Sequence, residues 1–324
     1  MRAAVYHRYG PPEVVHIEDI PKPVLKDNEV LVRVHTTSVC AADWRLRKAN
    51  PFFIRLFAGL WKPGKTPVLG MEFSGTVESV GKAVTRFHTG DQVFGGTGFT
   101  FGCHAEYVSL AEDGRLALKP ANMTFEQGAA VLFGAFTALH FLKKANVHAG
   151  QRVLIYGASG SVGVFAVQLA KHFGAYVAAV CSTTNLELVK SLGADEVIDY
   201  TKQDFSQAGR VYDVVFDTVG RSGFARSLRC LKRGGTFVQV GFVNLRTALR
   251  EALQARWASL TGAATTVSGT AKGTNADLAF FRELIEADKL HTVVDRCYPL
   301  AQIAEAHRLA EGGHKRGHVV VRVI

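Results

Sequence analysis

The stretch from Arg152 to Gly163, RVLIYGASGSVG, constrains the fold of this chain more than any other. An apolar run breaks into three glycines, and the segment VFAVQLAKHFG that follows has the apolar spacing of a helix. A strand, a glycine turn and a helix in such close succession form the first half of a βαβ unit. We therefore predict a strand over 152–156 and a helix over 161–173.

Each of the three glycines has a physical role in a dinucleotide site. Gly157 allows a tight exit from the strand, Gly160 lets the backbone approach a pyrophosphate, and Gly163 lets the helix pack closely. The positive end of the helix then faces the diphosphate. The spacing is G-x-x-G-x-x-G rather than G-x-G-x-x-G, and an ordinary strand-to-helix turn is the alternative, but the flanking strand and helix favour the dinucleotide site.

Composition excludes several other classes. With 324 residues the chain has room for two domains. Its net charge of +10 is dispersed along the chain, so we interpret it as a surface that favours anionic cofactors rather than nucleic acid. The five cysteines are scattered and suggest neither a disulfide framework nor a zinc knuckle. The longest apolar stretch is too short for a membrane span and the N-terminus lacks a signal core, so we expect a cytoplasmic location.

The chain changes character near residue 120. Residues 1–120 carry short apolar runs separated by Pro, Gly, Asp and Asn, which is typical of a β-barrel or sandwich. From Thr124 onward helices alternate with strands, which predicts an open parallel sheet with helices on both faces. The tail returns to β character, so we predict a first domain of 1–122 plus 290–324 and a second of 123–289.

Two local predictions accompany this division. Between Asn50 and Pro67 an apolar, aromatic segment is expected to be helical up to Gly59, and it is either a lid over an apolar substrate or part of the core. TFEQ, starting at Thr124, is a candidate capping box. The remaining predicted strands are 175–180, 196–200, 211–216, 236–241 and 263–268, and the predicted helices are 124–144, 185–192, 222–232, 246–257, 276–289 and 300–310.

Several longer segments carry a family resemblance. They are RAAVYHRYGPPEVV, LGMEFSGTVESVGKAVTRFHTGDQVFG, GQRVLIYGASGSVGVFAVQLAKHFGAYV, LGADEVIDY and GHVVVRV. Over nearly its whole length the chain resembles zinc-independent members of the medium-chain dehydrogenase/reductase superfamily, in the quinone oxidoreductase and enone (alkenal) reductase branch. The resemblance implies an α/β protein with a GroES-like β-barrel catalytic domain and a Rossmann domain with a doubly wound parallel sheet. It also implies hydride transfer from a nicotinamide and a homodimer that pairs the strand near 263–268 with its copy.

The residues at the zinc positions of this superfamily argue against a metal. Its alcohol dehydrogenases bind catalytic zinc through a Cys in C-x-x-D, a His in G-H-E and a third Cys or acid near the start of the Rossmann domain. This chain retains Cys40-Ala41-Ala42-Asp43, but it has Gly70-Met71-Glu72 at the second position and Phe133 at the third. One thiolate and a distant carboxylate do not make a zinc site, so we predict no metal. Without a Lewis acid, a quinone or a C=C bond conjugated to a carbonyl is the favoured acceptor.

Three residues of this region are candidate catalytic groups. Cys40 stands where quinone reductases often carry Asn near the nicotinamide ribose, and a small buried apolar residue is the alternative. Asp43 and Glu72 are candidates for supplying the proton that follows the hydride, with structural roles as the alternatives. His104 and Tyr6 are further candidates, and solvent is another source of the proton.

The cofactor preference depends on the tip of the second Rossmann strand. Sites that choose NAD carry an acidic residue there. This tip reads Cys181-Ser182-Thr183-Thr184-Asn185, without an acid, so NADPH is favoured and NADH is the alternative. Relatives often place an Arg or Lys in the tip and a Tyr after the third strand; Tyr200 matches the second feature, whereas Thr184 or Asn185 stands where the base would be. The predicted cofactor-binding residues are Thr137, Gly157, Ser159, Gly160, Ser161, Val162, Gly163, Ser182, Thr183, Thr184, Tyr200, Thr218, Gly241, Phe242 and Val243.

The predicted function is therefore an NADPH-dependent reductase of a small electrophile, either a quinone or an α,β-unsaturated carbonyl. One alternative is an alcohol dehydrogenase or carbonyl reductase, which the missing zinc ligands oppose. The other is a cofactor-binding protein with a non-catalytic role such as RNA binding, which some relatives show. Lys315, in the C-terminal HKRGH cluster, lies where relatives have a base near the cofactor, but we interpret it as a solvated charge.

Overall fold

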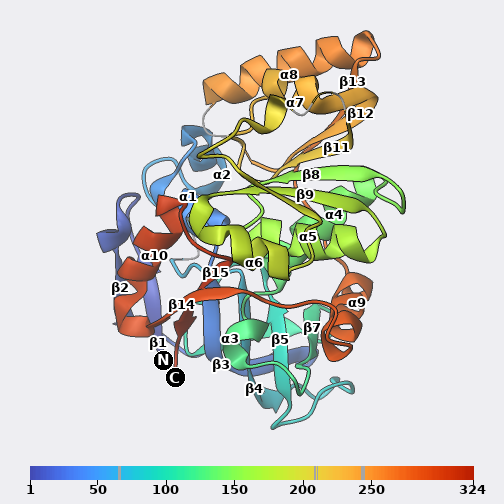
Figure 1. Cartoon of the computed structure of the whole chain (residues 1–324). Coiled ribbons are helices and arrows are strands. Elements are labelled where there is room, and N and C mark those ends of the chain that lie inside the picture. The colour runs from blue at the N-terminus through green and yellow to red at the C-terminus, as the bar shows by residue number, and fades with distance from the viewer. Residues whose placement is uncertain (65–66, 208, 210, 242–244) are drawn as a thin grey trace. The chain divides into compact units, whose positions relative to one another are not determined.

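The computed structural model describes residues 1–64, 67–207, 209, 211–241 and 245–324. The chain forms two compact units, and Figure 1 traces it from end to end. Unit 1 contains Met1–Phe133, Thr274–Asp288 and Thr292–Ile324. Unit 2 contains Gly134–Gly273 and Lys289–His291.

Unit 2 is built on a six-stranded parallel sheet with the strand order β10-β9-β8-β11-β12-β13. Numbered from its own first strand, this is the doubly wound order 3-2-1-4-5-6 of a Rossmann domain. The central strands are almost continuously apolar because helices cover both faces of such a sheet. The strands are β8 Arg152–Tyr156, β9 Tyr176–Cys181, β10 Glu196–Asp199, β11 Tyr212–Asp217, β12 Leu231–Gln239 and β13 Ala264–Ser268.

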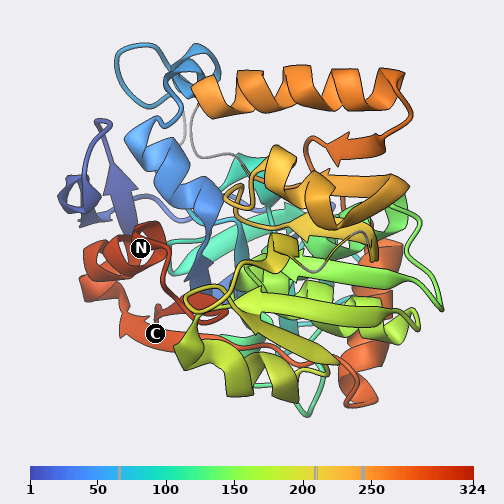
Figure 2. The same cartoon turned by 45° about the horizontal axis from the view of Figure 1, so that its top comes forward.

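The helices of unit 2 connect these parallel strands. The helix α5 begins directly after the glycine turn, and nine of its residues, Val162 to Ala170, are buried. The helix α8 packs on β13 and on α7, as Figures 1 and 2 show. The helices are α5 Ser161–His172, α6 Leu186–Ser191, α7 Phe224–Cys230 and α8 Leu245–Leu260, and α4 Leu132–Lys144 begins in unit 1 and continues into unit 2.

Unit 1 is built on a mainly antiparallel seven-stranded sheet with the order β14-β15-β3-β4-β5-β7, in which β6 pairs with β3. A separate two-stranded ribbon pairs β1 with β2. Both chain termini lie close together on this unit (Figure 1, Figure 2). The strands are β1 Arg2–Tyr6, β2 Val15–Asp19, β3 Glu29–Val39, β4 Glu72–Val80, β5 Gln92–Gly96, β6 Tyr107–Ala111, β7 Arg115–Leu118, β14 Val294–Pro299 and β15 His318–Arg322.

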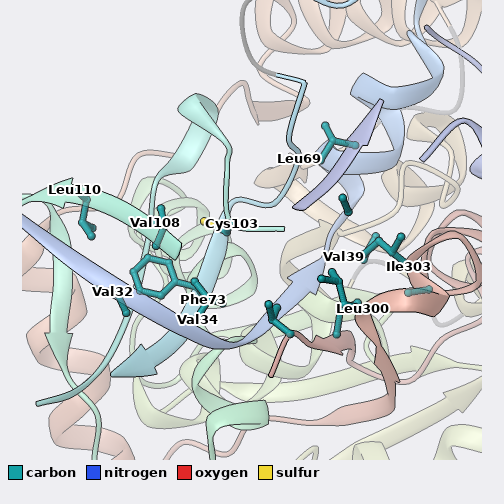
Figure 3. Close-up of a cluster of buried hydrophobic side chains, with 14 of the residues drawn as sticks. Val32, Val34, Val39, Leu69, Phe73, Cys103, Val108, Leu110, Leu300 and Ile303 are labelled. Carbon is teal, nitrogen blue, oxygen red and sulfur yellow. The ribbon is translucent and has the colours of Figure 1, made fainter. Parts of the chain in front are cut away.

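The core of unit 1 is centred on β3. Val30, Val32 and Val34 point to one face and are fully buried, and on the opposite face Leu31 is buried but Arg33 is exposed. Figure 3 shows Val32 and Val34 gathered with Phe73 and Val108 from the neighbouring strands. The helices around this sheet are α1 Ala41–Lys48, α2 Arg55–Ala58, α3 Phe125–Gly128, α9 Asn275–Glu286 and α10 Ile303–Gly312.

The compact units divide the chain at different places from the predicted domain boundaries. The helix α9 belongs to unit 1, where it packs on β7. Asn275 Nδ2 donates to the Asp113 carbonyl at 2.7 Å, and Asn122 Nδ2 donates to the Ile285 carbonyl at 2.7 Å. An alternation of helices and strands cannot reveal which sheet a helix packs against, so this boundary needed the tertiary contacts.

Two predicted elements differ in detail. The helix predicted over 124–144 is two helices, α3 and α4, although the predicted capping box of Thr124 and Gln127 is confirmed. The strand predicted over 236–241 begins at Leu231, which pairs with Tyr212 before a register shift. An irregular pairing of this kind leaves no mark in the period of the sequence.

The apolar segment after Asn50 is not part of the core. It forms a short 3₁₀ helix, Phe52–Ile54, followed by α2. Phe57 and Trp61 are each 87% exposed, and Phe52, Leu56 and Leu60 are also exposed. The core alternative for this segment was therefore wrong.

Candidate functional site

The glycine turn of unit 2 brings the backbone close to neighbouring atoms, and steric limits explain its glycines. Gly157 follows β8 with φ of 80°, a conformation that favours glycine. A Cβ on Gly163 would lie 2.2 Å from the Gly157 carbonyl oxygen, so a side chain cannot fit between α5 and the turn. A Cβ on Gly160 would meet nothing nearer than 3.5 Å, which leaves the N-terminus of α5 open to a ligand. The first turn of this 12-residue helix, with its backbone N–H groups, thus lies beside a position that has room for a ligand.

The loop after β11 is held against this turn. Thr218 Oγ1 donates to the carbonyls of Tyr156 at 2.9 Å and Gly157 at 3.1 Å. The buried Asp217 carboxylate accepts from the backbone N–H groups of Val219, Gly220 and Ser222 and from the Ser222 hydroxyl. Burial raises the pKa of Asp217, and these hydrogen bonds oppose the rise. The carboxyl ends of β8 and β11, where open α/β sheets bind ligands, are therefore fixed to each other.

The tip of β9 is organised by two polar side chains. Asn185 is buried, and its Nδ2 donates to Ser159 Oγ at 3.1 Å and to Ser182 Oγ at 3.0 Å. Thr183 Oγ1 donates to Asp199 Oδ2 at 2.6 Å. Hydrogen bonds lower the pKa of Asp199, and the bond from Thr183 has the largest effect. The Asn185 side chain is thus hydrogen-bonded within the tip and the glycine turn. Of Thr184 and Asn185, the two positions where relatives carry a base, only Thr184 is exposed.

Asp199 is a residue of this tip that sequence reasoning missed. It ends β10 opposite Cys181, so the pairing of two strands brings its carboxylate to the hydroxyl-rich tip of β9. Its Oδ1 also accepts from the N–H and the hydroxyl of Thr201. Asp199 is part of the sequence LGADEVIDY, but only the pairing of β10 with β9 shows that its carboxylate lies at the tip. Tyr200 follows it and is 48% exposed beside the tip.

The other predicted cofactor residues are distributed along unit 2. Ser161 and Val162 open α5. Gly241 is half-buried, and a Cβ on it would meet nothing nearer than the Val219 carbonyl group at 3.7 Å. Thr137 is 8% exposed in α4. Phe242 and Val243 lie outside the described residues.

In unit 1, Glu72 is the centre of a buried polar cluster. It is 1% exposed at the start of β4. Ser38 Oγ on β3 donates to its Oε1, and the Phe133 N–H donates to its Oε2 at 2.9 Å. Burial raises the pKa of Glu72 to about 7, although both hydrogen bonds act in the opposite direction.

Asp43 fixes the backbone on either side of the cluster. Its Oδ2 accepts from the Cys40 N–H at 2.7 Å, which caps α1, and its Oδ1 accepts from the Gly70 N–H at 2.8 Å. Gly70 has φ of 93°, and a Cβ there would lie 2.5 Å from His104 Cδ2. Both carboxylate oxygens are thus engaged by backbone, an arrangement that favours the structural role considered for Asp43.

The donors around Cys40 do not fit zinc. Cys40 Sγ lies 3.7 Å from Met71 Sδ, and Phe133 offers only backbone at the third position. Burial, followed by the nearby Asp43 carboxylate, raises the pKa of the Cys40 thiol well above its ordinary value. A catalytic zinc site needs three protein ligands of the Cys, His, Asp or Glu type, whereas these positions supply one thiol, a thioether and a phenylalanine.

Two histidines extend the cluster. His104 Nε2 donates to the Ser38 carbonyl at 2.9 Å, and its ring lies 5.6 Å from the buried ring of His307 on α10. Burial, together with His104 and Arg47, holds the pKa of His307 well below its usual range. His307 was not predicted, because nothing in the sequence connects α10 with the β3 segment. Tyr6 is buried as well, and burial raises its pKa.

Lys315 differs from its interpretation in the sequence. Its side chain is half-buried, and its Nζ donates to the Gly317 carbonyl. Burial lowers its pKa to about 8, although Cys40, Asp295 and Glu72 favour the charged form. The interpretation of Lys315 as a solvated charge was therefore wrong.

Comparisons with known proteins agree with this architecture. The family described as "Alcohol dehydrogenase GroES-like domain" matches residues 26–121, and "Zinc-binding dehydrogenase" matches 192–321. The "NADPH-dependent alkenal/one oxidoreductase, chloroplastic" of Arabidopsis thaliana is 34% identical over 335 residues, which cover 99% of this chain and 79% of the relative. The quinone oxidoreductase of Sus scrofa is 32% identical over 95% of this chain and 93% of its own. The solved quinone oxidoreductase from Coxiella burnetii gives a TM-score of 0.88 at 32% identity, with 100% and 99% of the two chains covered.

The helices also bear on membrane insertion. Among the residues that the structure describes, none of the helices combines the length and apolar character that crossing a membrane requires.

Proposed function

Because this chain belongs to the medium-chain dehydrogenase/reductase family, in its quinone oxidoreductase and alkenal reductase branch, we propose that it uses NADPH to reduce a quinone or an α,β-unsaturated carbonyl without catalytic zinc. The observation that carries this proposal is a complete nucleotide turn in a chain whose catalytic-zinc position holds Cys40 beside Met71. The proposal covers the acceptor class, the choice of NADPH and the absence of zinc.

The turn and the tip supply the cofactor contacts. The N–H groups at the start of α5 would hold the pyrophosphate, and the open space at Gly160 permits its approach. At the tip, Thr184 and Tyr200 are exposed, whereas Asp199 is engaged by Thr183 and Thr201. A carboxylate whose oxygens are already engaged is less available to hold the ribose 2′-hydroxyl of NADH, which supports NADPH. When bound, the cofactor supplies a hydride.

The acceptor class follows from the chemistry that remains. Without a metal to polarise an alcohol, the chain is suited to an acceptor that is already electron-poor. A quinone or enone takes up two electrons and one hydrogen as hydride, and a proton completes the reduction. The chain's contribution is then mainly orientation of the two reactants.

Cys40, Asp43 and Glu72 enter the proposal mainly through position. Asp43 holds the backbone of Cys40 and Gly70, and Glu72 holds Ser38 and the first turn of α4. We assign Asp43 and Glu72 to positioning rather than to direct proton transfer, since each of their carboxylates already has two partners. The proton then comes from solvent.

The assembly is part of the same proposal. The strand β13 is an edge of the six-stranded sheet, and Thr265 and Ser268 on it are exposed. An edge strand offers unpaired backbone groups to a second copy, which supports a homodimer through β13. Light scattering of the purified chain tests this, and a monomeric mass would contradict it. The cytoplasmic location stays a prediction.

The proposed function is tested by an activity assay with several candidate acceptors. Oxidation of NADPH and of NADH is followed with quinones, enones, alkenals and ethanol, and products are identified by mass spectrometry. We expect NADPH oxidation with a quinone or with an enone that becomes a saturated carbonyl. Tight NADPH binding without turnover of any acceptor would overturn the proposal, and an RNA gel shift that weakens with salt would then support the binding-protein alternative. Loss of activity on chelation, with metal found by elemental analysis, would overturn the zinc-free part alone.

A further inference from the structure

Three side chains on the β1–β2 ribbon form a second chemically distinctive cluster. They are His7, His16 and Glu18, and their ligand atoms all lie within 4.8 Å of one another. Among the residues that the structure describes, this is the only group of three His, Cys, Asp or Glu with such spacing. The cluster belongs to neither the nucleotide turn nor the Glu72 cluster.

The pairing of the ribbon brings the three residues together. His16 and Glu18 are two apart on β2, so their side chains leave the same face. Val5 on β1 pairs with His16, and His7 is two residues beyond Val5 along the same chain direction. The two imidazole rings have centroids 5.7 Å apart.

The backbone under this cluster is anchored. Tyr6, Val14 and Val15 are at most 5% exposed and belong to the core of unit 1. The ribbon strand β2 packs on α10, as Figure 1 shows. The ligand atoms therefore project from a fixed support into solvent, with side-chain exposures of 58% for His7, 51% for His16 and 38% for Glu18.

The hydrogen bonds favour a cation between these groups. His16 Nδ1 lies 3.2 Å from the Val14 carbonyl oxygen, which can only accept, so Nδ1 carries the hydrogen. The other nitrogen of that ring, Nε2, lies 2.6 Å from Glu18 Oε1. With the hydrogen on Nδ1, the lone pair of Nε2 points toward the Glu18 carboxylate, so both atoms can act as ligands once the cluster opens. A ring nitrogen fixed by a backbone carbonyl is also the usual support of a metal-binding histidine.

The second histidine approaches the same oxygen. His7 Nε2 lies 3.0 Å from Glu18 Oε1. Two ligands on a tetrahedral zinc ion with bonds of about 2.0–2.1 Å are separated by about 3.3 Å, so a small opening of the cluster would admit the ion. The exposed side chains can make this adjustment without disturbing the core.

We propose that His7, His16 and Glu18 bind one Zn²⁺ ion, with water completing the coordination. Two imidazoles and one carboxylate are a donor set that zinc and other late first-row divalent ions prefer, whereas Mg²⁺ favours oxygen ligands alone. The bound ion would link the end of β1 to β2. This site is independent of the proposed reduction and of the position of Cys40.

The test is a zinc titration of the tag-free full-length chain against a chromophoric chelator. We expect one Zn²⁺ per chain, with affinity weakened at least about tenfold in His16→Gln and in Glu18→Gln. His88→Gln is the matched control, since His88 is exposed beside Asp91 but belongs to no group of three such ligands among the residues that the structure describes. This control should bind zinc like the wild type.

Further readouts separate this site from other sources of binding. Mg²⁺ at equal concentration should not displace the zinc. With Co²⁺ as a probe, the absorption spectrum should lack a thiolate-to-cobalt charge-transfer band. No zinc binding by the wild type, unchanged binding in both His16→Gln and Glu18→Gln, or a thiolate band would each overturn the proposal.

Discussion

The nucleotide turn of unit 2 and the Glu72 cluster of unit 1 are constructed in opposite ways. The turn depends on side chains that are missing, since Gly163 leaves no room for a Cβ and Gly160 leaves room for a ligand. The cluster depends on buried polar side chains, with Glu72, Asp43 and His104 each engaged with backbone or hydroxyl groups. The turn therefore depends on the absence of side chains, whereas the cluster depends on buried charges and hydrogen bonds.

This difference controls how each region responds to change. The three glycines lie within seven consecutive residues, from Gly157 to Gly163. The neighbours of Gly160 and Gly163 belong to the same turn, and only those of Gly157, Thr218 and Val219, come from a distant segment. The cluster joins residues far apart in sequence, 34 positions from Ser38 to Glu72, 61 from Glu72 to Phe133 and 66 from Ser38 to His104. Substitutions in the turn should therefore act through sterics, and substitutions in the cluster should act through charge and pH.

The largest effect is expected at Gly163. Gly163→Ala places a Cβ 2.2 Å from the Gly157 carbonyl oxygen and 2.7 Å from Ala158, so α5 must move away from the turn. We expect a loss of about 3 kcal/mol in the free energy of unfolding and loss of NADPH binding. Denaturant unfolding and a fluorescence titration with NADPH measure both quantities.

Gly160→Ala is the matched control within the same turn. Its Cβ meets nothing nearer than 3.5 Å, so the free energy of unfolding should change by less than about 1 kcal/mol. Because the new methyl group enters the space for the pyrophosphate, NADPH should bind about tenfold more weakly, which corresponds to about 1.4 kcal/mol. Equal destabilisation by the two substitutions would contradict the different roles of these glycines.

The second effect concerns pH and Glu72. Burial raises the pKa of this carboxyl from 4.5 to about 7, so between these values the folded chain holds a proton that the unfolded chain releases. The stabilising contribution is present below pH 4.5 and is lost as the pH rises through 7. Relative to the wild type, Glu72→Gln should therefore gain stability over this range, by on the order of 3 kcal/mol for a shift of about two and a half pKa units.

Urea unfolding of both proteins at a series of pH values measures this trend. Glu78→Gln is the control, because Glu78 lies on the same strand with an exposed side chain paired to Lys22. It should show no trend of this size. A difference between the wild type and Glu72→Gln that stays constant from pH 4.5 to 8 would show that Glu72 is ionised throughout.

The smallest effect is expected at the tip of β9. Thr184 is exposed there, so Thr184→Arg adds a cation where a 2′-phosphate is proposed to lie. The affinity ratio of NADPH to NADH should rise about tenfold, the gain of one charge-assisted hydrogen bond. Ser191→Arg, at the exposed far end of α6, adds the same charge as a control. A similar rise in both variants would assign the effect to net charge rather than to the tip.

Much of unit 2 could be predicted because its signals are local. The strand over 152–156 has the predicted bounds, and α5 begins at Ser161 as predicted, since an apolar run, a glycine turn and a helical period follow one another directly. Asp199 was missed because its role depends on the pairing of β10 with β9. The assignment of α9 to unit 1 was missed because helical periodicity gives no information on the partner sheet.

In unit 1 the sequence predicted residue types but not their partners. That Met71 and Phe133 stand at positions where zinc enzymes carry ligands could be recognised from motifs. Glu72 and Asp43 could be named as candidate catalytic residues. That the Asp43 carboxylate binds two backbone amides, or that Ser38 and Phe133 meet at Glu72, could not. The His7, His16 and Glu18 cluster was likewise invisible, because only the antiparallel register of β1 and β2 brings it together.

The sequence by itself determined the family, the Rossmann turn and the residues at the zinc positions, because each is encoded by neighbours along the chain. Only the tertiary structure decided which polar groups are buried together and how their pKa values move. Hydrogen bonding and desolvation depend on distances between segments that the sequence separates by tens of residues.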